Sequence, residues 1–543
     1  MTINKYLKNL NNYPDATQQK WHGESSQVVY DLEGMKRCLQ NFQSPCFVIS
    51  DQTKTGLSNN GYLGASSGKN VKPYQAIPFC FPFSPSDLGD PEFKTSYGLK
   101  YAYIGGSMAN GISSAEMVIA LGKAGCMASF GSGGLVPAHI EKAIRQIQSA
   151  LPTEPYAFNL IHSPFEPDLE KKAVALYLKY GVNVIEASAY IDLTPSVVYY
   201  RIAGLSRGKN GIKIQNKIIA KISRKEVAEK FMSPPSPKIL SQLISEGLIT
   251  SEQASLAQNI PVADDITVEA DSGGHTDNRP LVSLLPSIIS LRDQLQTKFQ
   301  YSKPIRVGAA GGISTPESAL AAFAMGAAYI MTGSINQGCL EADTSDHVKK
   351  LLTQVDMADV TMAPASDMFE MGVKLQTLKK GTLFPMRGTK LYDIFQKYQS
   401  IDEIPLAEKS KLEKQVFQKS LDEVWQETVS FFSQRDPSQI NKAAQNPKKK
   451  MALIFRWYLG LSSFWAKSGL SGREMDYQIW CGPAMGAFNE WVRGSYLEQP
   501  ENRSAADVGL QILKGAAYLY RLNLLKAQSI WMSPELSQYM LSK

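Results

Sequence analysis

Cysteine is scarce in this chain, and the common metal and nucleotide motifs are missing. The 543 residues include six cysteines, at positions 38, 46, 80, 126, 339 and 481, with no C-x-x-C pair. Zinc sites and disulfide frameworks have closer or more regular spacing, so free thiols in a reducing cytoplasm are expected. H-E-x-x-H, G-x-x-x-x-G-K-[ST] and G-x-G-x-x-G are all absent. The sequence therefore predicts no metal site, no P-loop and no Rossmann fingerprint.

Long apolar runs are also lacking. The longest, 319–331, is shorter than the roughly 18–20 residues of a membrane span, and Gly326 interrupts it. Residues 1–15 lack the apolar core of a secretory signal. Lys and Arg number 57 against 50 Asp and Glu, and no nucleic-acid recognition motif accompanies this excess. Neither a membrane nor a nucleic acid is an expected partner, although a net charge of +7 is compatible with docking an acidic protein.

The middle of the chain alternates short apolar or β-branched runs with helical stretches. This alternation predicts parallel strands joined by crossover helices. Eight strands are expected, at 101–105, 125–130, 156–160, 182–186, 217–222, 266–270, 305–309 and 328–331. Their number favours an α/β fold closed as a (β/α)8 TIM barrel, with a doubly wound open sheet as the alternative.

The remaining segments are predicted additions to this barrel. Residues 1–95 would form an N-terminal extension rich in turn formers, and 96–342 would hold the barrel. A proline-rich and then helical segment, 231–261, is predicted as an insertion between strands five and six. Residues 343–543 would form a helical C-terminal region that packs on the barrel.

Glycine loops at the ends of the last two predicted strands indicate a phosphate site. Gly311 and Gly312 follow the seventh strand and precede a capped helix, while Gly333 and Ser334 follow the eighth. In β/α barrels this corner is a recurring phosphate site, because glycine lets the backbone approach the anion and helix N–H groups point at it. The alternative is a pair of ordinary tight turns.

A histidine just past the sixth predicted strand is the candidate catalytic residue. His275 ends the string Gly273-Gly274-His275 and is expected at the carboxyl-terminal face of the barrel, where barrel enzymes place their chemistry. Its side chain titrates near neutrality and can donate or accept a proton. The two glycines would let a flat ring lie against the backbone. A purely structural histidine is the alternative.

Small and polar residues at the other strand ends are expected to surround the same pocket. In chain order they are Gly106, Ser107, Met108, Asn159, His162, Glu186, Ser188 and Lys221. The first three follow the first strand and would line a planar cofactor. Polar groups at successive strand ends would form a ring around one pocket at the end of the barrel, although each alone would be an ordinary loop residue.

Longer strings resemble a known family. The segment ITVEADSGGHT at 266–276 resembles the glycine-glycine-histidine signature of the nitronate monooxygenase superfamily, which includes FMN-dependent enoyl-(acyl carrier protein) reductases. Segments 101–112, 186–190, 363–373, 455–460 and 480–486 are similar to the PfaD family within it. That family contains trans-acting enoyl reductases of polyunsaturated fatty acid synthases and trans-acyltransferase polyketide synthases. The similarity runs from about residue 95 to the C-terminus.

The resemblance implies an FMN-dependent enoyl reductase that takes hydride from NADPH or NADH and acts on thioesters of an acyl carrier protein. It implies that Gly311, Gly312, Gly333 and Ser334 hold the FMN phosphate and that His275 lies over the flavin beside the thioester. The other expected flavin contacts are Gly106, Ser107, Met108, Asn159, Glu186, Lys221, Gly273 and Gly274.

Two other functions stay open at this stage. One is a flavin oxidase or monooxygenase acting on nitronates with His275 as base, and the other is a flavoprotein scaffold without activity. The candidate partners are an acyl carrier protein, an acyltransferase and a second copy of the chain. An acidic carrier would need a basic surface, for which Lys379, Lys380 and Arg387, or the run 448–450, are the candidates. Ordinary solvated loops are the alternative for both.

Overall fold

Eight parallel strands close into a barrel in the computed structural model, which describes residues 7–8, 19–50, 54–65, 79–164, 166–209 and 211–541. The barrel strands are β7 Tyr103–Gly105, β8 Met127–Phe130, β9 Ala157–Ile161, β10 Val184–Ser188, β13 Lys217–Ile222, β14 Asp265–Glu269, β16 Arg306–Ala310 and β17 Ile330–Thr332. Each pairs with the next, and β17 pairs back with β7. The predicted TIM barrel is confirmed, and the open-sheet alternative is wrong.

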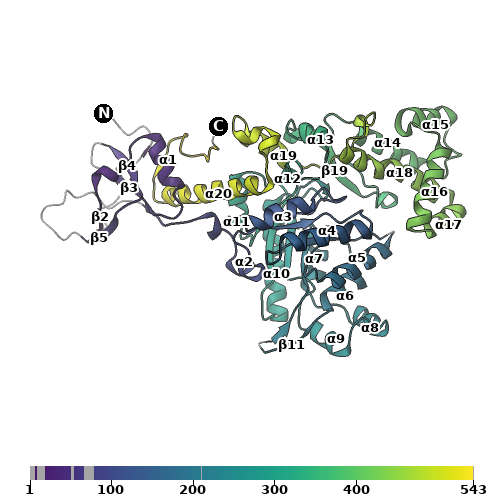
Figure 1. Ribbon diagram of the computed structural model, residues 1–543, viewed down its shortest axis with the longest axis horizontal. Coiled ribbons are helices and arrows are strands. Elements are labelled where there is room, and N and C mark those ends of the chain that lie inside the picture. The colour runs from purple at the N-terminus through teal and green to yellow at the C-terminus, as the bar shows by residue number, and fades with distance from the viewer. Residues whose placement is uncertain are drawn as a thin grey trace.

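Crossover helices surround this barrel (Figure 1). They are α3 Ala115–Lys123, α4 Pro137–Ala150, α5 Pro167–Tyr180, α6 Pro195–Ile202, α7 Lys225–Met232, α10 Leu281–Phe299, α11 Pro316–Ala324 and α12 Ser334–Gln337. Four begin with proline, whose missing N–H costs nothing in the first turn. In α4 the buried positions Ile140, Ile144 and Ile147 recur every three or four residues, so one face packs on the strands. The preceding helix α2, Pro91–Tyr97, leads into β7.

The segment between β13 and β14 carries α7 and two further helices, α8 Pro237–Ser245 and α9 Ser251–Ala257. The predicted helical insertion is therefore present. Figure 1 shows α8 and α9 at the bottom of the molecule, beside the hairpin of β11 Ser206–Gly208 and β12 Gly211–Lys213.

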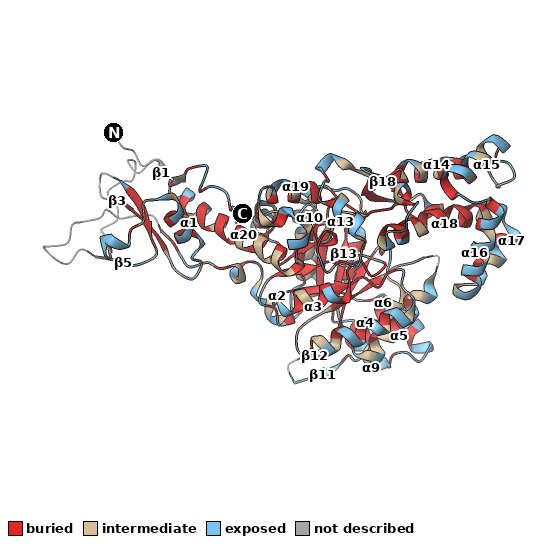
Figure 2. Cartoon of the chain, turned by 45° about the horizontal axis from the view of Figure 1, so that its top comes forward, coloured by how far each residue is buried: buried red, intermediate tan, exposed pale blue. Residues whose placement is uncertain are grey.

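The N-terminal segment forms a small lobe away from the barrel (Figure 1). Its elements are β2 Gln19–His22, α1 Leu32–Gln40, β3 Cys46–Ser50, β4 Thr55–Ser58, β5 Tyr62–Ala65 and β6 Phe79–Cys80. Residues 1–6, 9–18, 51–53 and 66–78 of the predicted extension lie outside the described residues. The long helix α20, Ala505–Ala527, joins this lobe to the barrel: Arg521 donates to the carbonyls of Asn41 and Ser44 at 2.5 and 3.0 Å. Figure 2 shows both β3 and α20 lined with buried residues. The strands β1 Leu7–Lys8 and β20 Trp531–Met532 pair as well, so both ends of the chain meet here.

The C-terminal region is mostly helical, as predicted, and besides β20 its described residues contain two longer strands. Its helices are α13 Asp346–Leu352, α14 Phe384–Lys397, α15 Leu406–Leu412, α16 Leu421–Arg435, α17 Ser438–Gln445, α18 Pro447–Ser468, α19 Ala484–Val492 and α20. The unpredicted strands, β18 Val360–Pro364 and β19 Lys374–Leu378, form a sheet with the two-residue strand β15, Gly274–His275. The division of the chain at residues 95 and 342 stays a prediction.

All six cysteines are buried and none forms a disulfide, which confirms the expected free thiols. In the described part of the chain, no helix is both long enough and apolar enough to cross a membrane. The described residues also contain no group of three or more His, Cys, Asp or Glu side chains placed to hold a metal ion.

Candidate functional site

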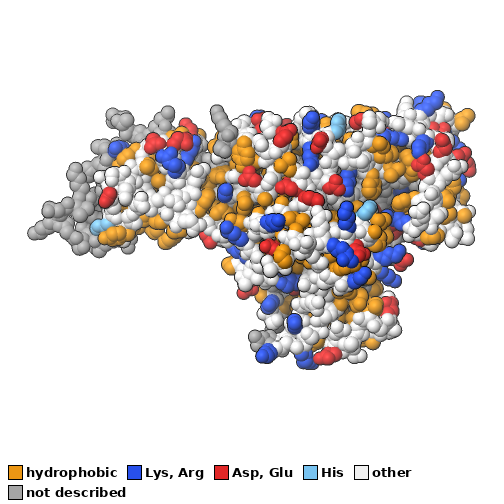
Figure 3. Space-filling view, viewed as in Figure 1, with side chains coloured by type: hydrophobic (Ala, Val, Ile, Leu, Met, Phe, Trp, Pro, Cys, Tyr) orange, Lys and Arg blue, Asp and Glu red, His pale blue; other side chains and the backbone are white. Residues whose placement is uncertain are grey.

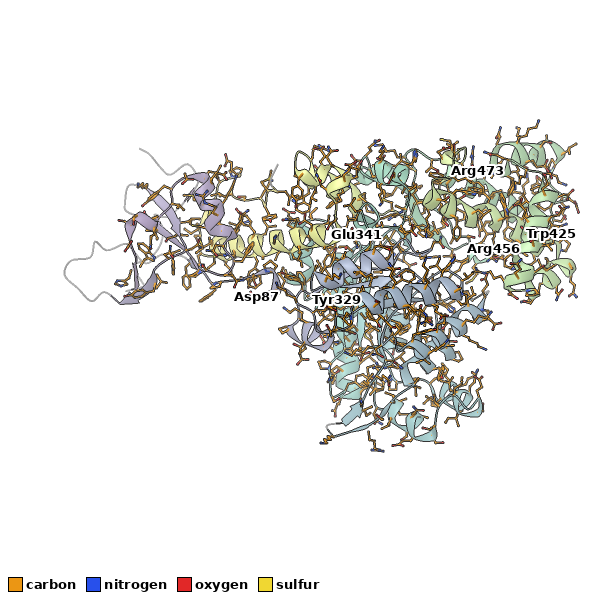
Figure 4. All side chains as sticks on the ribbon, viewed as in Figure 1. Asp87, Tyr329, Glu341, Trp425, Arg456 and Arg473 are labelled. Carbon is orange, nitrogen blue, oxygen red and sulfur yellow. The ribbon has the colours of Figure 1, made fainter. Side chains whose placement is uncertain are left out.

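A cavity of about 720 Å³ lies at the carboxyl-terminal ends of the barrel strands. One wall comes from the loops that follow the barrel strands. The other comes from α16, α18 and the segments around Asp367 and Trp480. Figure 4 shows Arg456, which lines the cavity, where the C-terminal helices meet the barrel. The barrel and the helical region therefore build this site together.

His275 is fixed in the cavity by a strand outside the barrel. Its strand β15 pairs antiparallel with β19, His275 opposite Leu375. Its Nε2 lies 3.1 Å from Oδ1 of Asp367, in the loop between β18 and β19. Desolvation in the cavity lowers the pKa of His275, but the charge of Asp367 and the hydrogen bond to it outweigh that effect, and the net shift is upward. The same pair lowers the pKa of Asp367 in spite of its desolvation. Both shifts favour the ion pair of a protonated His275 ring and a charged Asp367 carboxylate.

Lys221 lies between two carboxylates. Its Nζ is 3.4 Å from Oε1 of Glu186 and 3.3 Å from Oε1 of Glu269. Burial alone would lower the pKa of Lys221, but the two carboxylates raise it above its ordinary value. Burial raises the pKa of Glu269, and Lys221 opposes this only in part. The site therefore keeps a protonated amine at the cavity wall.

Glu186 itself does not line the cavity. It is buried behind the wall, where its carboxylate accepts hydrogen bonds from the backbone N–H of Ser107 at 3.1 Å and from its hydroxyl at 2.7 Å. Asn159, which does line the cavity, donates to the carbonyl of Glu186 at 3.1 Å and to Oγ of Ser188 at 2.8 Å. Glu186 thus positions the loop after β7 and the amine of Lys221.

The loop after β7 is held from both sides. A Cβ at Gly131 would lie only 1.7 Å from the carbonyl oxygen of Met108, so the loop can approach β8 only because residue 131 is glycine. On the other side, Nδ2 of Asn110 donates to Oγ of Ser463 at 2.9 Å, and Nζ of Lys467 donates to the carbonyl of Asn110 at 2.6 Å. Both partners belong to α18, which couples the C-terminal region to this loop.

The two glycines before His275 have different roles. Gly274 has a φ of +82°, and a Cβ there would meet nothing within 4 Å, so its face is open as expected. A Cβ on Gly273 would lie 2.8 Å from the backbone nitrogen of Cys481. The expectation that a flat ring lies against both glycines stays a prediction for Gly273, which lines the cavity and whose backbone packs on the segment 481–482.

The expected phosphate corner lies at adjacent strand ends. A Cβ on Gly312 or on Gly333 would meet nothing within 4 Å, and Gly312 has a φ of +72°. The Oγ of Ser314, two positions after Gly312, is buried without a hydrogen-bond partner in the described structure. Gly311 instead packs against the backbone of Ala270. This corner offers open backbone and an orphaned hydroxyl, a combination that suits an anion.

Ser334 and Gly106 have structural contacts of their own. Oγ of Ser334 accepts a hydrogen bond from the N–H of Gly482 at 3.0 Å. A Cβ on Gly106 would lie 3.0 Å from the side chain of Met331, inside the barrel. Neither residue lines the cavity.

The structure brings together part of the predicted set. The predicted residues that line the cavity are Ser107, Met108, Asn159, Ser188, Lys221, Gly273, Gly274 and His275. Those that do not are Gly106, Glu186, Gly311, Gly312, Gly333 and Ser334. His162 is also outside, because Nδ1 lies 3.4 Å from Glu170 and its ring stacks on Tyr190.

Sequence reasoning missed Asp367, Glu269 and Trp480. The sequence could have pointed to two of them, because Asp367 lies in one of the family-like strings and Glu269 ends the sixth strand. The pairing of Asp367 with His275, about a hundred residues earlier, left no signal in the sequence. Trp480 has a buried indole N–H without a partner among the described residues and lines the cavity. Its N–H is therefore a donor at the cavity wall that the described part of the fold leaves unsatisfied.

The predicted basic docking surfaces are largely wrong. Arg387 pairs with the buried Asp476, and Lys449 pairs with Glu370. Lys448 donates to two backbone carbonyls, those of Phe395 and Tyr398. These three cations pair with groups of the protein itself, because a buried charge needs a partner, so they are not free to bind a carrier. Figure 3 shows basic and acidic side chains interspersed on the face that it draws.

Three family models match the chain. The model described as nitronate monooxygenase matches residues 94–384. The model of the fatty acid synthase subunit PfaD N-terminal domain matches residues 21–75. A third, the inserted helical domain of [acyl-carrier-protein] S-malonyltransferase, matches residues 398–477. These matches confirm the resemblance, and they extend it to the N-terminal lobe.

Two named relatives and one solved structure point to the same family as these models. The chain is 49% identical to one of the polyunsaturated fatty acid synthase subunits of Thraustochytrium sp., covering 91% of this chain and 33% of that protein. It is 49% identical to polyketide biosynthesis protein PksE of Bacillus subtilis, covering 80% and 56%. The chain thus spans about a third to just over half of these two relatives. The crystal structure of the enoyl reductase domain of MlnA, from the macrolactin biosynthesis cluster of Bacillus amyloliquefaciens, is 43% identical, with a TM-score of 0.77, covering 82% of this chain and 99% of that one.

Proposed function

The chain belongs to the nitronate monooxygenase family, and from this premise we propose that it is an enoyl reductase that reduces the α,β-double bond of thioesters on an acyl carrier protein. The observation that carries the proposal is the His275–Asp367 pair at the end of β14, in a cavity ringed by the ends of the barrel strands. The likeness to an enoyl reductase domain over nearly its whole length supports the same reaction.

Flavin mononucleotide is the proposed cofactor. The open backbone at Gly312 and Gly333 and the orphaned hydroxyl of Ser314 fit its phosphate. Gly311 and Ser334 would complete that corner. Met108, Asn159, Lys221 and Gly274 line the adjoining cavity and would hold the ring system. When bound, the flavin supplies hydride, taken from NADPH or NADH, to the β-carbon of the thioester.

His275 supplies the proton in this proposal. Because Nε2 faces Asp367, Nδ1 is the ring nitrogen available to the substrate. The charged ring stabilises negative charge on the thioester oxygen and then donates its Nδ1 proton to the α-carbon. Asp367 keeps the ring charged and oriented, and the N–H of Trp480 is a second donor at the same end of the cavity.

The partnership with Asp367 favours the protonated form of His275, which is the form that a proton donor needs. A silent scaffold would have no use for a charged pair held in an open cavity.

Anaerobic stopped-flow absorbance tests the proposal. The protein reconstituted with FMN should lose its flavin absorbance on addition of NADPH and recover it on addition of a crotonyl-carrier thioester. Loss without recovery would point to the nitronate reaction instead. Failure to take up FMN at all would contradict the flavoenzyme proposal.

The proposed function also implies partner proteins. The relatives are subunits of polyunsaturated fatty acid synthases or proteins of polyketide biosynthesis, so an acyl carrier protein and an acyltransferase are the partners we propose. A cytoplasmic location and a homodimer are also proposed. Sedimentation of the purified chain with and without carrier protein would test both kinds of association.

A further inference from the structure

The cavity extends beyond the residues around His275. It continues between the barrel helices α4 and α5 on one side and the C-terminal helices α16 and α18 on the other. This part is here called the distal slot. Its apolar lining residues come from all four helices and are Ile140, Leu169, Ala173, Phe431, Phe432 and Leu453. Polar side chains of the same helices also line the cavity, among them His139, Glu170, Glu427, Thr428 and Arg435. The distal slot therefore has apolar side chains on both sides, with polar groups among them.

Most of these polar groups already have partners in the protein, since Glu170 accepts a hydrogen bond from Tyr190 and Thr428 donates to the carbonyl of Val424. Nε of Arg435 donates to Oε2 of Glu166 at 2.7 Å, which ties the end of α16 to the start of α5. The indole N–H of Trp457 donates to Oε2 of Glu427 at 3.1 Å. A ligand carrying hydroxyl or keto groups would find few free donors or acceptors here, and burying such groups unpaired is unfavourable.

The end of the cavity around His275 is polar. His275, paired with Asp367, and Lys221 lie there, together with the N–H of Trp480, which has no partner in the described part of the chain. A thioester carbonyl can pair with these groups, whereas a hydrocarbon gains nothing from them. The two ends therefore fix the direction of a ligand that has one polar end and one apolar end.

We infer that the distal slot binds the acyl chain of the substrate and selects an unsubstituted hydrocarbon over a hydroxylated chain. This inference rests on the proposed enoyl reductase function and names its substrate class. Phe431 of the distal slot is 53% exposed, and two further lining residues, Val136 and Phe464, are 46% and 41% exposed, so the apolar path continues to the surface. An acyl chain longer than the distal slot can follow this path to the surface.

Chain length gives the first test. Each methylene that the cavity covers adds about fourfold to affinity. The KM of crotonyl, octenoyl and dodecenoyl carrier thioesters should therefore fall along the series, by about tenfold or more overall. A dodecenoyl thioester with a hydroxyl group in mid-chain should have a higher KM than the plain one. Equal KM values along the series, or no effect of the hydroxyl, would overturn the inference.

A pair of alanine variants on α5 gives the second test. Ala173 lines the distal slot, whereas Ala175, on the same helix, is exposed and does not. Ala173→Trp should raise the KM for the dodecenoyl thioester by about tenfold or more, since the slot can no longer cover the chain, and leave crotonyl turnover unchanged. Ala175→Trp should change neither. If Ala173→Trp loses crotonyl turnover as well, the smaller change Ala173→Leu decides, and an unchanged dodecenoyl KM in that variant would overturn the inference.

These experiments separate the two proposals. If the enoyl reductase proposal fails, no thioester, crotonyl included, reoxidises the NADPH-reduced protein. If only the distal slot is misassigned, crotonyl turnover persists and neither chain length nor Ala173→Trp changes KM.

Discussion

Nε2 of His275 and Oδ1 of Asp367 lie 3.1 Å apart although 92 positions separate the two residues. His275 follows a barrel strand, and Asp367 belongs to the C-terminal region. The short sheet of β15, β19 and β18 brings them together. The C-terminal region therefore contributes directly to the proposed active site, beyond covering it.

Asp367→Asn should lower the turnover of enoyl thioesters by about tenfold or more, because a neutral amide stabilises the charged ring of His275 less well. Asp367 raises the pKa of His275, so its removal should lower that pKa. The protonated ring is then lost at a lower pH, and the alkaline limb of the kcat profile should move toward acid. Steady-state rates measured across pH check this.

Asp359→Asn is the matched control for that prediction. Asp359 pairs with Lys380 at 3.2 Å on the surface and does not line the cavity. Its variant should keep the native pH profile. An Asp367→Asn enzyme with reduced turnover but an unmoved alkaline limb would assign Asp367 a structural role only.

Gly131→Ala should displace the loop that carries Met108. The added Cβ would lie 1.7 Å from the carbonyl oxygen of Met108, so the backbone must move, and overpacking of this kind costs about 1–3 kcal/mol. We expect weaker FMN binding, measured by fluorescence titration, together with lower resistance to urea. Gly338→Ala is the control, since its nearest contact would be an ordinary 3.4 Å to the end of Met485. Equal FMN affinity in both variants would contradict the assignment of this loop.

The barrel was predictable because each strand carries its own apolar pattern and several crossover helices begin with a proline or a capping hydroxyl. Gly312 and Gly333 were predictable for a similar reason, since glycines at the ends of adjacent parallel strands meet at one corner. The partnership of His275 with Asp367 was not, because β15 has only two residues and its pairing is set by tertiary contacts.

The misjudged basic docking surfaces have a related cause. A lysine or arginine in a run looks the same in sequence whether it is solvated or paired. Arg387 has its partner, Asp476, 89 positions away, and Lys449 has Glu370 79 positions away. Only the packed helices reveal that these charges are engaged.

Lys221→Met should destabilise the protein more at pH 8 than at pH 5. Without the amine, the carboxylates of Glu186 and Glu269 are left side by side without their shared cation. Removal of one partner from a buried ion pair lowers the free energy of unfolding by about 3–5 kcal/mol. The pKa of Glu269 is already raised by burial and should rise further. A group whose pKa is raised in the folded state favours folding at low pH and opposes it as pH increases. Urea unfolding at the two pH values measures the difference, and Lys221→Met with Glu269→Gln should recover part of the loss.

Arg387→Gln should lower stability and leave carrier affinity unchanged, because Arg387 serves the fold. Its partner Asp476 is only 1% exposed and also accepts from the hydroxyl of Tyr458 at 2.7 Å and from Arg473 at 3.0 Å. Since these two donors remain, the loss should be about 1–3 kcal/mol in urea unfolding. Lys379→Gln, a change at an exposed position, should leave unfolding at its native value. If Arg387→Gln weakened carrier binding at full stability, Arg387 would belong to a docking surface after all.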